Sequence, residues 1–393
     1  MRTASRPTNL PEVPYAGVVQ VRIEDLPTPA LLLDLDRLEA NLQRMAERAR
    51  SLGVALRPHI KTHKCVEIAE RQQALGATGI TVSTLYEAAV FASHGFSDQT
   101  WAFPLNPSRM DELAELCDRV RLGVVVDSLE AVEWLIDGSI RAPVWIKVDC
   151  GYHRAGVDPK GRLAEVIALG LQDAPELEFA GLLSHSGQAY DAGSPAEIGI
   201  VAEHERAVMC TLAERLRDAG IGVPGVSVGS TPSMSQVVHL SGVTEIRPGN
   251  YAFYDRDQAW LGSCSYRDPA LTVLTTVVSS QPGAAHCVVD AGALALSKDP
   301  GPEAAPPSMA EIYEDYARGR LAVGSRVVAL SQEHGIVNAP YPLGMRLRVL
   351  PNHSCLTAYH FNSYWVTSGD DVVQRWTIWS GREPPSERPA SSR

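Results

Sequence analysis

The sequence contains no stretch that approaches the ~20 consecutive apolar residues of a membrane-spanning helix. Its N-terminal segment, MRTASRPTNLPEVPYAG, also lacks the apolar core of a signal peptide. Lysine and arginine form no long block, and the formal net charge is −11, which argues against nucleic acid or an anionic membrane as the main partner. We therefore expect a cytoplasmic protein that acts on a small molecule.

Closely spaced cysteine pairs are missing as well. The seven cysteines are an odd number, are widely scattered and include no CxxC pair. This pattern argues against a disulfide scaffold, and we expect mostly reduced thiols.

Apolar, β-branched runs alternate with helical patterning up to about residue 261, in a chain of 393 residues that is 45% hydrophobic and long enough for two domains. The first four runs start about 22 residues apart, the length of one βα unit, and eight such units close into a (β/α)8 barrel. An open doubly wound sheet is the alternative, but it usually has fewer strands, and no GxGxxG follows the first run. The eight predicted strands are 54–60, 78–82, 100–104, 122–127, 144–149, 179–186, 226–230 and 244–249.

Beyond residue 261 the pattern changes to strands separated by Gly, Pro, Asn and Asp. Only AEIYEDYARGR has helical patterning there, and TPALLLDLD (28–36) resembles a strand that joins this part from the N-terminal side. We predict a barrel over 38–261 and a mainly antiparallel β domain formed by 1–37 and 262–393. Both ends, up to about Tyr15 and from about Glu383, have the composition of flexible tails.

The stretch RPHIKTHK (57–64) concentrates positive charge directly after the first predicted strand. On a strand, Arg57, His59 and Lys61 would share the face that lines the barrel, with Lys61 at the carboxyl end where barrel enzymes place their chemistry. Burial and the neighbouring charges would lower the pKa of the Lys61 amine, as a Schiff-base lysine requires. Lys64 would be solvated. A basic loop at the barrel rim explains the motif equally well.

Two later strand ends are rich in small residues. GVSVGSTPS (225–233) has the free backbone N–H groups that can cradle a phosphate, although such turns are common in loops. EIRPGNYAFYD (245–255) adds Gly249 and Asn250. An imine-forming lysine together with an anion cradle is typical of pyridoxal 5′-phosphate (PLP) sites.

These motifs, together with ITVSTLYEA, VDCGYHRAGV, SHSGQAY and LPNHSC, resemble the D-serine dehydratase and D-threonine aldolase family over about residues 28–380. The resemblance implies a fold-type III PLP enzyme, with an alanine-racemase-type barrel, a following β domain and a homodimer. It also implies that Lys61 binds the cofactor covalently. The implied phosphate contacts are Gly229, Ser230, Thr231, Gly249 and Asn250, and Arg154 and Tyr190 are implied as polar groups beside the cofactor.

The motif PNHSC presents His353 and Cys355 two residues apart, which on a strand would point to the same side. Taken alone, the pair is more often simply packed in a β domain than bound to a metal. The resemblance, however, makes it the metal site, and the thiolate favours Zn²⁺ over harder divalent cations. Asp often replaces this Cys in the family's aldolases, so the pair is more similar to the dehydratases.

The sequence thus predicts a PLP- and zinc-dependent lyase, with catalytic residues Lys61, His353 and Cys355. It would eliminate water from a D-3-hydroxy amino acid of the D-serine or D-threo-3-hydroxyaspartate type, giving a 2-oxo acid and ammonia. A metal-dependent aldolase that yields glycine and an aldehyde, and a non-catalytic PLP-binding protein, are the alternatives. His334 either orients the metal water or substrate or is structural, and His59 and His185 have no assigned role.

Overall fold

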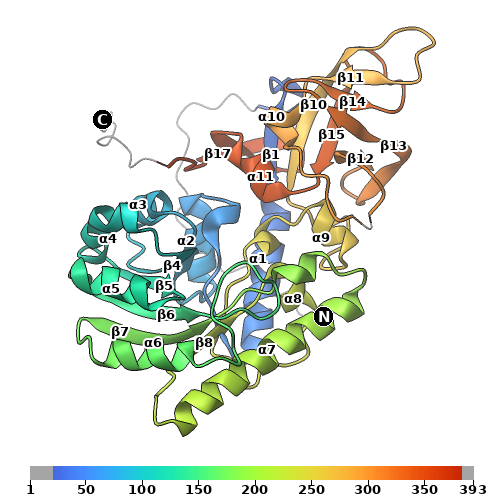
Figure 1. Cartoon of the computed structure of the whole chain (residues 1–393). Helices are drawn as coiled ribbons and strands as arrows, with labels where there is room; N and C mark the ends of the chain where they lie inside the picture. Colours follow the sequence, from blue (N-terminus) through green and yellow to red (C-terminus); the bar gives the residue numbers. More distant parts are fainter. Residues whose placement is uncertain (1–20, 304, 383–393) are drawn as a thin grey trace, which may run out of the picture.

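The computed structural model describes residues 21–303 and 305–382, so the predicted tails lie outside the described residues. Two sheets organise this part of the chain: an eight-stranded parallel sheet and a nine-stranded, mainly antiparallel sheet. Figure 1 shows the parallel sheet and its helices at the lower left and the second sheet at the upper right, with α1 (Leu35–Ser51) running from one to the other.

The parallel sheet closes into a barrel, with strand order β2-β9-β8-β7-β6-β5-β4-β3. Its first and last strands are joined by backbone hydrogen bonds from Thr78 N to Leu56 O and from Thr81 N to Pro58 O. This closure excludes the open doubly wound sheet, and the prediction of an eight-stranded barrel is confirmed. The strands are β2 (Ala55–Leu56), β3 (Ile80–Val82), β4 (Asp98–Pro104), β5 (Arg121–Val126), β6 (Ala142–Lys147), β7 (Leu177–Leu183), β8 (Gly225–Val228) and β9 (Glu245–Ile246).

Helices surround the barrel strands (Figure 1). Side chains cap their first turns: Asp34 accepts a hydrogen bond from Arg37 N (3.0 Å) at the start of α1, and Ser128 accepts one from Ala131 N (3.2 Å) at the start of α5. Gly53, with φ +70°, follows the end of α1. The remaining helices of this part are α2 (Val66–Ala74), α3 (Leu85–Ser93), α4 (Met110–Cys117), α5 (Leu129–Asp137), α6 (Leu163–Gln172), α7 (Pro195–Asp218), α8 (Thr231–Gln236) and α9 (Arg256–Trp260).

The second sheet has the order β11-β14-β13-β12-β15-β10-β1-β16-β17. Its N-terminal strand β1 pairs antiparallel with β10 and parallel with β16, so the two ends of the described chain meet towards the β17 edge of the sheet. The elements are β1 (Ala30–Asp34), β10 (Leu271–Ser279), β11 (Cys287–Val289), α10 (Ala293–Leu296), β12 (Ala310–Asp315), β13 (Arg320–Leu330), β14 (Gly335–Val337), β15 (Arg346–Pro351), α11 (Ser354–Tyr359), β16 (Ser363–Ser368) and β17 (Asp371–Thr377).

The helical patterning of AEIYEDYARGR is misleading. Residues Ala310–Asp315 form strand β12, which pairs with β13 on one side and β15 on the other. Backbone hydrogen bonds to two neighbouring strands, with Ile312 and Tyr313 buried, outweigh the local preference for a helix.

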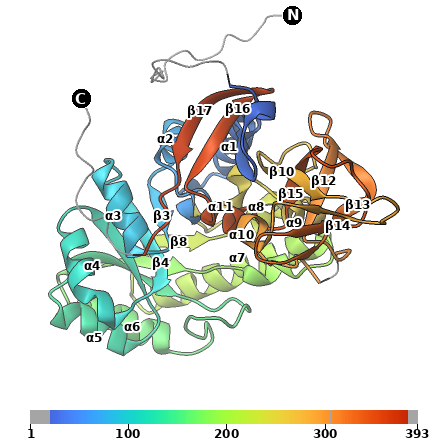
Figure 2. The same ribbon diagram turned by 90° about the horizontal axis from the view of Figure 1, so that it is seen from above.

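Helix α11 contacts the short 3₁₀ helix η2 (Ile60–Thr62), and Figure 2 shows α11 where the two sheets approach each other. All seven cysteines are free, as predicted. None of the described helices combines the length and the apolar character needed to cross a membrane.

Candidate active site

A cavity of about 360 Å³ lies where the carboxyl ends of the barrel strands face the second sheet. The segments that follow β2, β6, β7, β8 and β9 line it, together with the loop after α10 and the residues at the start of α11. All the predicted site residues except Gly229 line this cavity: Lys61, Arg154, Tyr190, Ser230, Thr231, Gly249, Asn250, His353 and Cys355. His59 and His185 also line it, whereas His334 lies exposed in the turn between β13 and β14 and does not.

The side chain of Lys61 lines this cavity and projects from η2. The surrounding protein desolvates its amine, which lowers the pKa of Lys61, as predicted. Arg154 and Lys64 lower this pKa further, while Cys355 and Glu87 act in the opposite direction.

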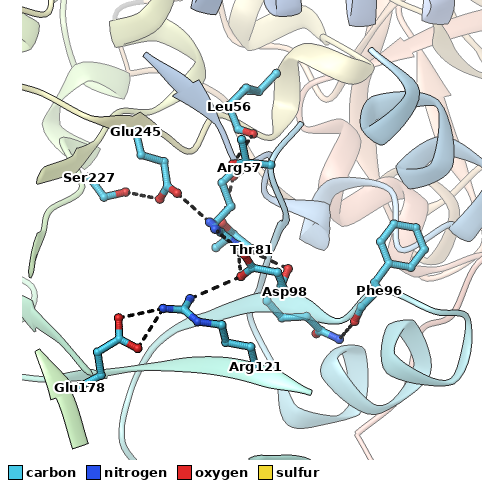
Figure 3. A network of polar contacts seen from close by, with 11 residues as sticks. Leu56, Arg57, Thr81, Phe96, Asp98, Arg121, Glu178, Ser227 and Glu245 are labelled. Atoms are coloured by element: carbon cyan, nitrogen blue, oxygen red, sulfur yellow. Dashed lines mark hydrogen bonds and ion pairs between the residues drawn. The ribbon is translucent and has the colours of Figure 1, made fainter. Parts of the chain in front are cut away.

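Arg57 does not act on Lys61 in the way the strand pattern predicts. Strand β2 ends at Leu56, and the Arg57 guanidinium is engaged in an ion pair inside the barrel, with Nε 2.7 Å from Glu245 Oε2. It also binds Asp98, at 2.8 Å between Nη1 and Oδ1 (Figure 3). The backbone hydrogen bonds of the barrel continue to His59, whose N–H donates to Pro248 O at 3.0 Å, and Lys61 follows in the short turn η2 rather than on a strand.

Lys64 is not solvated either. Its amine forms an ion pair with Glu87, which is buried and also accepts hydrogen bonds from the backbone N (2.6 Å) and the hydroxyl (2.9 Å) of Ser83. Lys64 has φ +48°, a conformation in which this turn reverses the chain directly after Lys61. The two lysines of the motif therefore have different tasks, since one faces the cavity and the other anchors the turn.

The residues predicted to form a phosphate cradle lie together at the ends of β8 and β9. Gly249 leaves no space for a side chain, since a Cβ there would lie 2.6 Å from His59 O. Thr231 Oγ1 accepts a hydrogen bond from Tyr251 N (3.1 Å), which ties the two strand ends together. Gly229 supports the turn from behind: it has φ +100°, and its N–H lies 3.4 Å from the buried Glu205 carboxylate.

Arg154 and Tyr190 approach the cavity from the loops after β6 and β7. The Arg154 guanidinium lies 5.0 Å from the ring centre of Tyr152. Burial raises the pKa of Tyr190, so its hydroxyl stays protonated and can donate a hydrogen bond.

His353 and Cys355 line the same cavity. They do not share a strand, because β15 ends at Pro351 and Cys355 belongs to the first turn of α11. The helical turn nevertheless brings the imidazole and the thiol close to each other. Although burial opposes both charges, the contact raises the pKa of His353 and lowers the pKa of Cys355, which favours the thiolate.

Comparisons with known proteins agree with this geometry. The family model of the alanine racemase N-terminal domain matches residues 33–257, and the serine dehydratase domain model matches residues 270–367. The chain belongs to the D-serine dehydratase and D-threonine aldolase family. It is therefore a PLP-dependent lyase of fold type III.

Three relatives of this lyase cover nearly its whole length. D-threo-3-hydroxyaspartate dehydratase from Delftia sp. is 38% identical, and the match covers 89% of this chain and 97% of that one. D-serine dehydratase from Dictyostelium discoideum is 37% identical, with 89% and 96% covered, and D-threonine aldolase from Arthrobacter sp. is 33% identical, with 90% and 91% covered. The solved structure of the Delftia enzyme superposes with a TM-score of 0.87, covering 92% of this chain and 100% of that one. D-threo-3-hydroxyaspartate dehydratase has also been solved as a cysteine-to-alanine mutant in the metal-free form, with a TM-score of 0.87 and 37% identity, covering 92% of this chain and 100% of that one.

Several cavity residues of this lyase escape the motif analysis. Lys147 ends β6, and burial, helped by the nearby Arg247, lowers its pKa to about 7. The rule that selects Lys61, a lysine at the carboxyl end of a barrel strand, selects Lys147 too. Arg247 follows β9 in the same way, whereas Asp257 and Asp299 come from loops whose position the sequence does not reveal.

The residues of the cavity fit both groups that the family implies. Its volume lies within the usual range for a cofactor site, and it is lined by both an amine of lowered pKa and a cradle that tolerates no side chain at Gly249. A thiolate and an imidazole close together are donors suited to Zn²⁺, and a metal held by two protein ligands keeps positions for water and substrate. Among the described residues, no group of three or more His, Cys, Asp or Glu side chains is arranged to hold a metal.

Proposed function

We propose that the chain eliminates water from a D-configured 3-hydroxy amino acid, giving a 2-oxo acid and ammonia, with PLP on Lys61 and Zn²⁺ on His353 and Cys355. The observation that carries this proposal is that the Lys61 amine and the His/Cys pair line one cavity, with Cys355 in contact with the turn that carries Lys61. Chemistry at Cα and at the β-hydroxyl of one small substrate needs this arrangement.

Lys61 and the His353 and Cys355 pair have different tasks. Bound PLP supplies an electron sink that acidifies the α-hydrogen of the substrate. Lys61 removes this proton, which its lowered pKa favours because the neutral amine is the base. Ser230, Thr231, Gly249 and Asn250 bind the phosphate, while Arg154 and Tyr190 orient polar groups of the cofactor and substrate.

The metal held by His353 and Cys355 would assist departure of the leaving group. A divalent metal supplies a Lewis acid for the β-hydroxyl, which is otherwise a poor leaving group. His353 and Cys355 hold it, and the thiolate favours Zn²⁺ over Mg²⁺ or Mn²⁺. Cys355 Sγ lies 3.3 Å from Thr62 Oγ1, and Thr62 directly follows Lys61 on η2, so the metal pair lies close to the amine.

A retro-aldol reaction is the second candidate, since the similar D-threonine aldolase from Arthrobacter sp. belongs to the same family. One assay separates the two. Purified protein is incubated with D-serine, D-threonine and D-threo-3-hydroxyaspartate, and 2-oxo acid and glycine are both quantified, with and without a chelator. We expect 2-oxo acid that disappears on chelation and returns with Zn²⁺.

Glycine as the main product would refute the elimination. A protein that carries PLP, is purified without zinc and shows no turnover even after Zn²⁺ is added would favour the non-catalytic PLP-binding protein. Lys61→Arg is the control, because it keeps the charge but cannot form the covalent bond, and it should lose both the borohydride-fixed cofactor and the activity. The homodimer and the cytoplasmic location stay predictions from the sequence.

A further inference from the structure

The carboxylate of Asp299, which is not one of the proposed metal ligands, lies within hydrogen-bonding distance of His353. Asp299 Oδ2 is 2.8 Å from His353 Nδ1, and both side chains line the cavity. Asp299 comes from the loop after α10, 54 positions away in the sequence, so a specific loop conformation is needed to bring it there.

The loop holds Asp299 from several sides. Its second oxygen, Oδ1, accepts a hydrogen bond from Gly301 N at 3.0 Å, and its backbone N–H lies 3.3 Å from Ser297 Oγ. Asn352, the neighbour of His353, donates from Nδ2 to the carbonyl oxygen of Asp299 at 2.9 Å. The carboxylate therefore has one oxygen fixed by the backbone and the other left for the imidazole.

This contact decides which nitrogen of His353 carries the proton. An ionised carboxylate only accepts hydrogen bonds, so Nδ1 of His353 must be the donor. In the neutral ring the lone pair then lies on Nε2. The ring also contacts Cys355, so the free nitrogen and the thiolate belong to the same small region of the cavity.

We propose that Asp299 is a positioning residue for the metal: it holds His353 in the Nδ1–H tautomer and fixes its ring, so that Nε2 and the Cys355 sulfur are presented together to a divalent cation. This rests on the metal site of the proposed function. Histidine ligands whose outer nitrogen is bound in this way lose metal affinity when the partner is removed, typically 10- to 100-fold.

Two substitutions separate orientation from mere packing. In Asp299→Asn, Gly301 N–H keeps the amide oxygen on its own side, so the amide NH₂ faces Nδ1 of His353. The ring must then accept at Nδ1 and carry its proton on Nε2, where it blocks the metal. Asp299→Ala removes the support but permits either tautomer. The isosteric variant should therefore bind zinc more weakly than the truncated one, the reverse of the order expected from a packing role.

The measurement is zinc affinity by competition with a chromophoric chelator on PLP-loaded protein, and the cofactor absorbance and thermal midpoint check that each variant is folded. We expect Asp299→Asn to weaken zinc binding about 10- to 100-fold, and Asp299→Ala to weaken it less. Asp191→Asn is the matched control, because it removes one negative charge from the same cavity without a hydrogen bond to His353. It should stay within about threefold of the unmodified protein.

Zinc affinity of Asp299→Asn equal to that of the unmodified protein, or an Asp299→Ala variant that binds no better than Asp299→Asn, overturns the proposal. An equal loss in Asp191→Asn also overturns it, because net charge alone would then explain the effect. Failure of the metal site itself gives a different result: the unmodified protein and Cys355→Ala would then bind zinc equally well.

Discussion

The ion pair between Arg57 and Glu245 inside the barrel should contribute strongly to stability, and a matched pair of substitutions tests this. Both side chains are only 9% exposed, and Nε lies 2.7 Å from Oε2 (Figure 3). Asp98 contacts the same guanidinium at 2.8 Å, but its side chain is 37% exposed. Glu245→Gln and Asp98→Asn thus remove one negative charge each from the same partner, at different depths.

The expected magnitudes follow from burial. Removing one member of a buried pair costs about 3–5 kcal/mol, because the remaining charge stays desolvated. A pair with a partly exposed member contributes about 1 kcal/mol or less, since water replaces the lost partner. We therefore expect Glu245→Gln to lower the free energy of unfolding by roughly 2–4 kcal/mol more than Asp98→Asn.

Equilibrium unfolding in urea, followed by tryptophan fluorescence, measures both values. A further variant checks the cause: adding Arg57→Met to Glu245→Gln should recover part of the loss, because it removes a buried guanidinium that is left with only the partly exposed Asp98 as partner. Equal costs for Glu245→Gln and Asp98→Asn would falsify the reasoning from burial. A double variant less stable than Glu245→Gln alone would point to lost packing of the Arg57 chain instead.

Three further outcomes are expected. Burial lowers the pKa of His63 from 6.5 to about 3. The contribution of its neutral ring to folding stability is therefore complete above pH 6.5 and is lost as the pH falls toward 3, by about 1.4 kcal/mol per pH unit. His63→Gln should reduce the fall in urea-measured stability between pH 7 and 5 by about this slope, and an unchanged pH dependence contradicts it. Lys64→Met leaves the buried Glu87 carboxylate without its cation and should cost about 3 kcal/mol in the same assay, against less than about 1 kcal/mol for the exposed Lys160→Met. Cys355→Asp replaces a soft donor with a hard one and should raise the preference for Mn²⁺ over Zn²⁺ in metal competition, whereas an unchanged preference argues against Cys355 as a ligand.

The fold could be predicted from the sequence because its signals are local and repeated. The spacing of the apolar runs identifies the barrel strands, and residues such as Ser128 mark helix starts that the structure confirms. The segment 310–315 shows the limit of this reasoning, because pairing with β13 on one side and with the more distant β15 on the other outweighs its helical pattern.

The candidate site could be predicted only in part, for a related reason. Lys61, His353 and Cys355 stand in short motifs whose residue types point to their chemistry. The partners that tune them come from elsewhere: Glu87 binds Lys64 from α3, and Asp299 reaches His353 from a loop with no motif of its own. A pattern that assumes a continuous strand also misplaces Arg57, whose carboxylate partner is 188 positions away.

The turn that carries Lys61 is formed by the barrel but is held by the second sheet. Three contacts reach the residues directly after Lys61: Cys355 Sγ to Thr62 Oγ1 at 3.3 Å, Tyr364 Oη to His63 O at 2.7 Å, and Trp379 N to Lys64 O at 2.8 Å. Buried backbone carbonyls need such partners, and the barrel alone would leave those of His63 and Lys64 without them. The position of Lys61 relative to the His353 and Cys355 pair therefore depends on the contacts between this one turn and the second domain.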